Sequence, residues 1–314
     1  MVMQTETTEL NRVIWMLWFQ GFDQAPEIVQ LCVRSWKVRN PTWQVIQLSN
    51  ANLTDYVHPD ELALLRSMGL PPQKLANLIR IYLISRHGGV WADATCFCCK
   101  PLDNWLPDYM ASGFFAYRFH ADAWLRGYRR PAIFALRTKA GDKIVANWFL
   151  AAVKGNPLAT RVYDQHRDFF RRSNFKLQSR VNAGEDGSAR RKRAARRAER
   201  IGRVLNRNAK LAQWWTSPLI TKTARVYPYF IFHYHFARIV SRDPVCKELW
   251  ARTPVLFAEG PLTYIRALVG PVTDQQIADL TQCKQPFYKL TWKYRWDLYQ
   301  DGCFLDHLFR SIPE

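Results

Sequence analysis

The stretch that decides the fold is residues 72–102, which read PQKLANLIRIYLISRHGGVWADATCFCCKPL. Apolar residues recur at helical spacing through its first half, which predicts a helix buried on more than one side. Gly88 and Gly89 supply the left-handed backbone that ends helices, and residues 90–92 then read as a short apolar strand. The stretch therefore predicts a helix, a glycine stop and a buried strand ending at Asp93, at a sheet edge where α/β proteins bind nucleotides.

Two polar residues of the predicted helix and the carboxylate after the strand carry the chemistry of this stretch. Asn77 and Arg80 are three residues apart, so both lie on one face of the helix. A buried arginine costs free energy unless an anion, such as a carboxylate or a phosphate, pairs with it. Asp93 interrupts an apolar run where an acid has no structural use. Two interpretations stay open: these groups bind a ligand, or Arg80 and Asp93 only pair with each other. The first makes an enzyme the leading hypothesis.

The sequence before this stretch alternates between predicted strands and helices. Residues 13–19 are apolar and predict a buried strand, and a helix follows from Ala25 to Asn40. Residues 43–48 predict a second strand, and another helix follows Pro59. This alternation predicts an α/β fold with a mostly parallel sheet covered by helices.

After Pro101 the pattern is mixed. Strands are predicted at 113–119 and 132–136, helices at 146–153 and 158–170, a linker at 182–189 and a buried aromatic element at 227–236. The chain as a whole predicts one domain, residues 1–314. Its parts are a core over about 11–155, a basic helical insertion over about 185–212 and a helical C-terminal elaboration over 213–314.

Composition limits the class of protein. The chain has 314 residues, of which 48% are hydrophobic, so it can bury a sizeable core and is not globally disordered. The N-terminal residues are polar and predict no signal peptide, and no apolar run is long enough to predict a membrane span. Three of the seven cysteines fall in residues 96–99. Neighbouring strand residues face opposite sides, so these thiols cannot all reach one metal. We expect small buried hydrophobes in a reducing cytoplasm.

Much of the net charge of +19 lies in residues 190–210, which hold ten Arg and Lys against one Glu. Three interpretations stay open for this basic run. It could bind nucleic acid through phosphates, but one stretch beside a linker is unlike a basic face spread over several motifs. It could form a partly amphipathic helix that docks on an anionic membrane surface, at the inner membrane face. It could also be a solvated insertion without a role.

Several segments together resemble bacterial capsular polysaccharide synthesis proteins, which are similar to a larger group of glycosyltransferases with a DxD motif. The segments are IWMLWFQG at 14–21, APEIV at 25–29, SWK at 35–37, NP at 40–41, NLIR at 77–80, GGVWADAT at 88–95, ANWFLAA at 146–152, YFIFHY at 229–234 and KLTWK at 289–293. No single segment is decisive, but the set spans most of the chain.

The resemblance implies a GT-A-like, Rossmann-like fold whose core binds a nucleotide-sugar. It implies transfer of a sugar, from a UDP-linked donor and with retention of configuration, to a capsular or other surface polysaccharide or glycolipid acceptor. By resemblance, Trp18 stacks on the base and Arg80 contacts the donor. Asp93 matches the first Asp of DxD, which makes Arg80 and Asp93 the candidate catalytic residues.

The chain departs from the motif at two positions. Asn77 stands where relatives with the full motif have Asp, and Thr95 stands where they have the second Asp, the usual metal ligand. The resemblance implies a divalent cation, Mn²⁺ or Mg²⁺, with Asp93, Thr95 and His233 as its candidate ligands. A threonine hydroxyl is a weaker ligand than a carboxylate for such ions. A sugar-binding protein without catalytic activity therefore stays a third hypothesis.

The remaining candidates follow from the chemistry of the leaving group. A nucleoside diphosphate leaves with negative charge that a metal or cations must stabilise, and Lys289 and Lys293 are candidates to supply it. Each could instead lie on a solvated strand face. His233 could be a metal ligand, a phosphate donor or a hydrogen-bonded core residue. Asn147 and Trp148 could line the acceptor side, or Trp148 could simply pack in the core.

Overall fold

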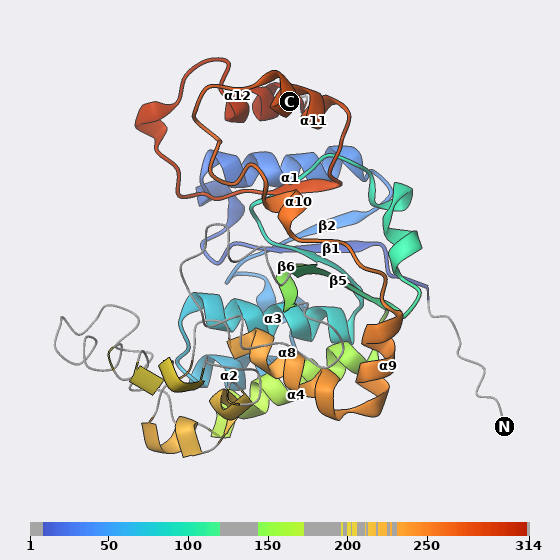
Figure 1. Cartoon of the computed structure of the whole chain (residues 1–314), viewed down its shortest axis with the longest axis vertical. Coiled ribbons are helices and arrows are strands. Elements are labelled where there is room, and N and C mark those ends of the chain that lie inside the picture. Colours follow the sequence, from blue (N-terminus) through green and yellow to red (C-terminus); the bar gives the residue numbers. More distant parts are fainter. Residues whose placement is uncertain are drawn as a thin grey trace.

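A computed structural model describes residues 9–119, 144–172 and 231–312, with scattered residues between 196 and 227. The described chain forms a central sheet between two layers of helices (Figure 1). The sheet has the order β2-β1-β3-β6-β5. Its strands are β1 (Val13–Leu17), β2 (Gln44–Leu48), β3 (Gly89–Ala92), β5 (Phe114–Phe119) and β6 (Ile144–Ala152).

Strand direction follows from the pairings. β1 is parallel to β2 and to β3, whereas β6 is antiparallel to β3 and to β5. Four strands of this sheet therefore point the same way and β6 opposes them. The predicted α/β class with a mostly parallel sheet is confirmed.

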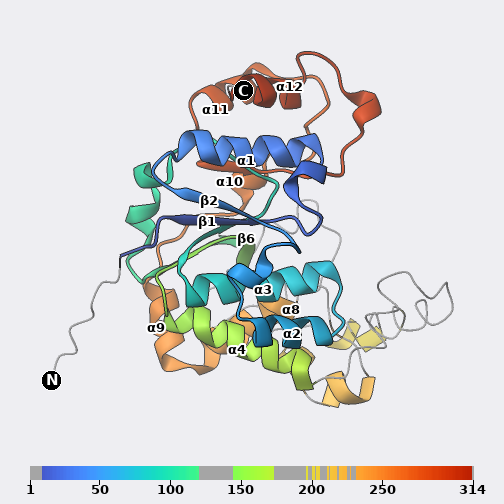
Figure 2. The same cartoon turned by 180° about the vertical axis from the view of Figure 1, so that it is seen from behind.

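The two faces of the sheet carry different segments (Figures 1 and 2). One face packs against α2 (Pro59–Ser67), α3 (Pro72–Arg86), α4 (Pro157–Arg172), α8 (Ile231–Arg242) and α9 (Pro244–Arg252). The other face packs against α1 (Glu27–Arg39), α10 (Glu259–Leu262), α11 (Asp274–Thr281), α12 (Phe304–Arg310) and a two-stranded sheet of β4 (Cys96–Cys98) and β7 (Phe287–Lys289). Segments from both ends of the chain thus build the second layer.

Alternation along the first strand produces these two cores. In β1, Trp15 points to the α3 side, whereas Ile14 and Met16 point to the α1 side. All are buried, and burying one such side chain fully contributes about 1.5–3 kcal/mol. A strand that is apolar on both faces must lie inside the sheet, which fits the position of β1 between β2 and β3.

The glycine pair before β3 is required by its surroundings. Gly88 and Gly89 have φ of +73° and +90°, values that side chains with a Cβ rarely adopt. A Cβ on Gly88 would lie 2.7 Å from the backbone nitrogen of Lys154, and one on Gly89 would lie 2.6 Å from the carbonyl oxygen of Val13. The predicted glycine stop between helix and strand is confirmed, and it lets β3 pass close beside β1.

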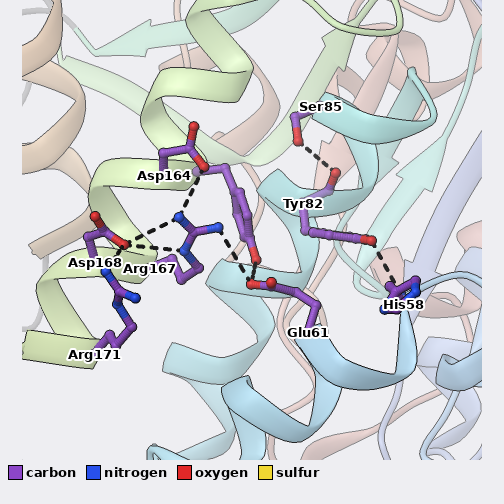
Figure 3. A network of polar contacts seen from close by, with 9 residues as sticks. His58, Glu61, Tyr82, Ser85, Asp164, Arg167, Asp168 and Arg171 are labelled. Carbon is purple, nitrogen blue, oxygen red and sulfur yellow. Dashed lines mark hydrogen bonds and ion pairs between the residues drawn. The ribbon is translucent and has the colours of Figure 1, made fainter.

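A polar network ties α4 to α2 (Figure 3). The Tyr163 hydroxyl of α4 donates to Glu61 of α2. Arg167 lies 3.9 Å from Glu61 and also contacts Asp164 at 3.5 Å and Asp168 at 3.3 Å. Burial is the largest cause that raises the pKa of Tyr163, and its bond to Glu61 adds to it. The network joins α2 to α4, and the backbone nitrogen of His58, just before α2, donates to the Tyr82 hydroxyl of α3 at 3.2 Å.

Most predicted elements before residue 120 match the structure, but one later prediction is wrong. Residues 146–153 were expected to be helical and instead form most of β6. The segment is apolar and alanine-rich, and a short apolar run does not distinguish a buried strand from a buried helix. The aromatic element at 227–236 includes the start of α8, which begins at Ile231, and the predicted helix at 158–170 is α4.

Other predictions fall partly or wholly outside the described residues. The strand at 132–136 lies outside them, and so does most of the basic insertion at 185–212. The C-terminal elaboration is largely helical where described, but it also contributes β7 to the second sheet. The division of the chain into these parts stays a prediction. Among the described residues, no helix is both long enough and apolar enough to cross a membrane.

Candidate functional site

A cleft of about 580 Å³ opens where β1 and β3 end, which is within the usual size of ligand pockets. The chain passes from β1 to β2 on one side and returns through α3 to β3 on the other, so the strand order reverses between β1 and β3. Ligands of open α/β sheets bind at such a switch point, beyond the carboxyl ends of the strands. The predicted site residues that line the cleft are Trp18, Asn77, Arg80, Asp93, Thr95, Asn147, His233 and Lys289.

Arg80 and Asp93 form an ion pair on the wall of the cleft. Arg80 Nη2 donates to Asp93 Oδ1 at 2.7 Å, and Trp91 Nε1 donates to the same oxygen at 3.0 Å. The guanidinium also lies 5.0 Å from the centre of the Trp91 ring and donates to the Asn147 carbonyl. Arg80 is only 6% exposed, whereas the Asp93 side chain is 27% exposed. The two charges therefore balance each other, while the carboxylate still faces the cleft.

The uncharged residue at position 77 has a direct partner. Asn147 of β6 donates from Nδ2 to Asn77 Oδ1 at 3.1 Å. The same residue accepts a hydrogen bond from Arg80 at its backbone carbonyl. Strand β6, which the sequence pattern had predicted as a helix, thus holds Asn77 and Arg80 of α3 at the cleft. An Asp at position 77 would add a second acid beside Arg80, whereas Asn77 leaves the Arg80–Asp93 pair neutral overall.

Lys289 reaches the cleft through the pairing of β4 with β7. The register places Lys289 opposite Cys96, and the backbone nitrogen of Leu290 donates to the Thr95 carbonyl at 2.8 Å. Lys289 Nζ then donates to Thr95 Oγ1 at 2.6 Å and to the Leu290 carbonyl at 3.0 Å. Both acceptors are uncharged. These contacts therefore leave the charge of the ammonium uncompensated, whereas Asp93 compensates the charge of Arg80.

Two tryptophans mark one end of the cleft. Trp18 follows β1 and meets Trp292 edge to face, with ring centres 5.9 Å apart. Both line the cleft, and Trp292 is 46% exposed. A half-exposed indole pair offers an apolar surface on which a planar ring can stack. Trp292 belongs to the KLTWK segment, but sequence reasoning gave a role only to its lysines.

Lys74 is a cleft residue that sequence reasoning missed. It lines the cleft but is only 6% exposed, and its ammonium lies 5.7 Å from the centre of the Tyr227 ring. Burial lowers the pKa of Lys74 to about 7. Its spacing was the available signal: Lys74 precedes Asn77 by three residues, just as Asn77 precedes Arg80, so one helix face carries all three.

Two predicted residues lie elsewhere. Trp148 packs in the aromatic core, 5.2 Å from Tyr117 and 5.6 Å from Phe287 between ring centres, so the packing alternative holds for it. Lys293 is exposed and lies 5.2 Å from the centre of the Trp292 ring, outside the lining of the cleft.

His233 lies on the cleft wall formed by α8. It is close to a buried pair, in which His166 Nδ1 and His235 Nδ1 are 2.6 Å apart. Burial, together with nearby cations, lowers the pKa of His235 to about 3, so this imidazole is neutral at ordinary pH.

The predicted ligand set does not fit a divalent cation well. Asp93 already contacts the guanidinium of Arg80, and Thr95 already contacts the ammonium of Lys289. A divalent cation bound to either oxygen would lie close to a like charge. In the described part of the chain, no three His, Cys, Asp or Glu side chains gather closely enough to hold a metal ion. The roles of Asp93, Thr95 and His233 as ligands stay predictions.

An α/β sheet with an ionic cleft at its switch point belongs to the class of folds that bind nucleotides there. A model of the capsular polysaccharide synthesis protein family matches residues 2–178. The chain belongs to this family, as its sequence resemblance predicted.

Curated relatives are named as glycosyltransferases. The chain is 26% identical over 162 residues to O-glycosyltransferase braB of Annulohypoxylon truncatum, covering 48% of this chain and 36% of that protein. It is 27% identical over 104 residues to the putative glycosyltransferase HOC1 of Saccharomyces cerevisiae, covering 31% of this chain and 26% of that protein. The matches thus span about a third or a quarter of these relatives.

A solved structure titled PaToxG glycosyltransferase aligns with 69% of this chain and 85% of its own, at 12% identity and a TM-score of 0.34. By family and by relatives, the chain is glycosyltransferase-like.

Proposed function

We propose that this protein transfers a sugar from a nucleotide-sugar donor to a saccharide acceptor. One observation carries the proposal: residues from four separate segments, each predicted to bind the donor, line a single cleft. The cleft lies at the switch point of the sheet, where a nucleotide is expected. The glycosyltransferase names of the relatives support the same reaction class.

The cleft offers a chemical reason for each proposed role. Trp18 provides a ring face for the base, with Trp292 beside it. The Asp93 carboxylate accepts hydrogen bonds from hydroxyls of the ribose or of the sugar, held in place by Arg80 and Trp91. Lys289 provides positive charge for the diphosphate.

In the reaction, the bond between the anomeric carbon and the diphosphate oxygen breaks, and the diphosphate leaves with the electron pair. An acceptor hydroxyl bonds to the anomeric carbon and releases its proton. Positive charge already in place at the departing oxygens lowers the barrier.

We extend the proposal to the finer expectations from the family. The parallel β2-β1-β3 unit with Asp93 after β3 supports a GT-A arrangement. The donor is a UDP-sugar, transfer retains the anomeric configuration, and the acceptor is a capsular or other surface polysaccharide or its glycolipid precursor.

Donor turnover tests the proposal. The purified chain is incubated with UDP-, GDP- and CMP-sugars, each with and without saccharide acceptors, and the released nucleotide is measured. One preferred donor is expected, with turnover at least a hundredfold lower in Trp18→Ala. The exposed variant Asp60→Asn serves as a control that leaves turnover unchanged, because Asp60 lies outside the lining of the cleft and 3.8 Å from the exposed His58.

A sugar-binding protein without catalysis is the second candidate, because Asn77 and Thr95 both replace acids of the motif. It predicts that saccharides or nucleotide-sugars bind but that no donor is consumed. If no sugar nucleotide binds at all, the proposed function fails, and nucleic-acid binding by the basic run becomes the hypothesis to test.

A further inference from the structure

We propose that the Lys289 ammonium takes the place of a divalent cation in this cleft, so that the donor diphosphate binds and leaves without a metal ion. This inference rests on the proposed function, because it concerns the charge of that diphosphate. It differs from the expectation for the motif, in which the second acid holds a metal.

The position of the ammonium is the first argument. Thr95 stands two residues after Asp93, where the motif places its second acid. Antiparallel pairing of β4 with β7 brings Lys289 beside this residue, and Nζ lies 2.6 Å from Thr95 Oγ1. The ammonium therefore contacts the side chain at the position where the motif places a metal ligand.

The number of donors is the second argument. A lysine ammonium has three N–H donors. Thr95 Oγ1 and the Leu290 carbonyl accept two of them. The third N–H is left for a phosphate oxygen, and the contacts to the Thr95 hydroxyl and the Leu290 carbonyl orient it. A charge-assisted bond of this kind is about twice as strong as a neutral one.

The charge balance is the third argument. Arg80 also lines the cleft, but Asp93 neutralises it at 2.7 Å. The two acceptors of Lys289 are neutral, so its charge remains to be met by the ligand. An Asp at position 95 would pair with Lys289 and cancel that charge. A hydroxyl holds the ammonium without neutralising it.

Calorimetric titration of the full chain with UDP, GDP and CDP and with the matching nucleosides tests the inference. In EDTA, the preferred nucleoside diphosphate is expected to bind at least tenfold more tightly than its nucleoside, and added Mn²⁺ should change that affinity less than twofold. Lys289→Met should weaken diphosphate binding about ten- to a hundredfold, leave nucleoside binding unchanged and resist rescue by Mn²⁺.

Control variants distinguish the loss of the Lys289 charge from a loss of folded structure. Lys247→Met removes an exposed lysine of α9 and should bind like the wild type. Lys289→Arg keeps the positive charge and should retain affinity within about tenfold in EDTA. Near-ultraviolet circular dichroism confirms that each variant is folded.

A gain of metal binding provides the converse test. Thr95→Asp combined with Lys289→Ala removes the ammonium and restores the second acid. In the presence of the diphosphate, this double variant should bind Mn²⁺, whereas the wild type should not. Electron paramagnetic resonance measures the bound Mn²⁺. A double variant that binds no Mn²⁺ would mean that Lys289 does not stand at the cation position.

The outcomes distinguish the two levels of the proposal. Diphosphate binding that requires Mn²⁺ in the wild type, or that survives Lys289→Met unchanged, would overturn the inference but leave the proposed transferase intact. No binding of any nucleoside diphosphate, with or without Mn²⁺, would instead overturn the proposed function.

Discussion

In the cleft, two basic side chains each donate to an oxygen of a neighbouring residue, but the two pairs differ in net charge. Arg80 and Asp93 are 13 residues apart, come from one helix–turn–strand unit and neutralise each other. Lys289 and Thr95 are 194 residues apart, meet through a separate small sheet and leave a positive charge in place. The first contact is an internal ion pair that shapes the cleft, whereas the second supplies charge to a ligand.

Because of this difference, substitutions in the two pairs should affect stability and ligand binding to different extents. A buried ion pair is costly to break, because removing one partner leaves the other charge without compensation. An ammonium on neutral acceptors is less costly to remove, since no opposite charge is left behind. Substitutions at Asp93 should therefore reduce both stability and turnover, and substitutions at Lys289 should reduce mainly diphosphate affinity.

Asp93→Asn should be the most destabilising of these substitutions. It keeps the size of the side chain but leaves the Arg80 guanidinium, 6% exposed, without its counter-charge. We expect the free energy of unfolding to fall by about 3 kcal/mol, measured by urea denaturation.

The double variant Arg80→Leu, Asp93→Leu should recover part of this stability without recovering donor turnover, because it removes both charges together. If Asp93→Asn were as stable as the wild type, the pair would not act as the internal ion pair described above.

Lys74 is a third basic residue of the cleft, and its protonation makes the stability of the protein depend on pH. Its folded pKa is about 7 against an ordinary value of 10.5, because burial disfavours its charged form. Between these values the unfolded chain holds a proton that the folded chain has released, so this residue makes stability rise with pH. Lys74→Met should remove a slope of at most about 1.4 kcal/mol per pH unit.

Urea denaturation of wild type and Lys74→Met between pH 7 and 10 gives this slope as a difference. Both chains share the other titrating groups, whose contributions cancel. The variant should be the more stable of the two at pH 7, and its advantage should shrink toward pH 10. A constant difference across the range would contradict the shift.

Thr95→Val should have the smallest effect on stability. The methyl group replaces the hydroxyl that accepts from Lys289 at 2.6 Å, so one hydrogen bond is lost without leaving an opposite charge exposed. We expect about 1 kcal/mol of destabilisation and a several-fold loss of diphosphate affinity, measured by calorimetry. An effect on stability as large as that of Asp93→Asn would contradict the difference between the Arg80–Asp93 and Lys289–Thr95 contacts.

The parts of the fold that local sequence determines were predictable. The helix, the glycine stop and the strand at 72–93 depend on helical spacing and on two positive φ angles, which neighbouring residues specify. The same local unit contains Asn77, Arg80 and Asp93. Asp93 reaches the cleft because parallel strands end at one edge of a sheet, and Arg80 of α3 meets it there.

Features that depend on distant pairing were not predictable in the same way. β6 has an apolar pattern that fits either a strand or a buried helix, and only its position between β3 and β5 decides between them. The contact of Lys289 with Thr95 requires the register of β4 with β7, which no local pattern encodes. Lys74 differs, because its helical spacing was visible but its burial was not.

The distance of Lys289 from Thr95 along the chain also has a consequence during synthesis. Trp18 and Asp93 are translated early, whereas Lys289 is added 194 residues after Thr95. At translation rates of about 5–20 residues per second, this gap lasts roughly 10–40 seconds. A nascent chain can therefore form the Arg80–Asp93 pair but lacks Lys289, so under our proposal it binds a donor diphosphate only after β7 has paired with β4.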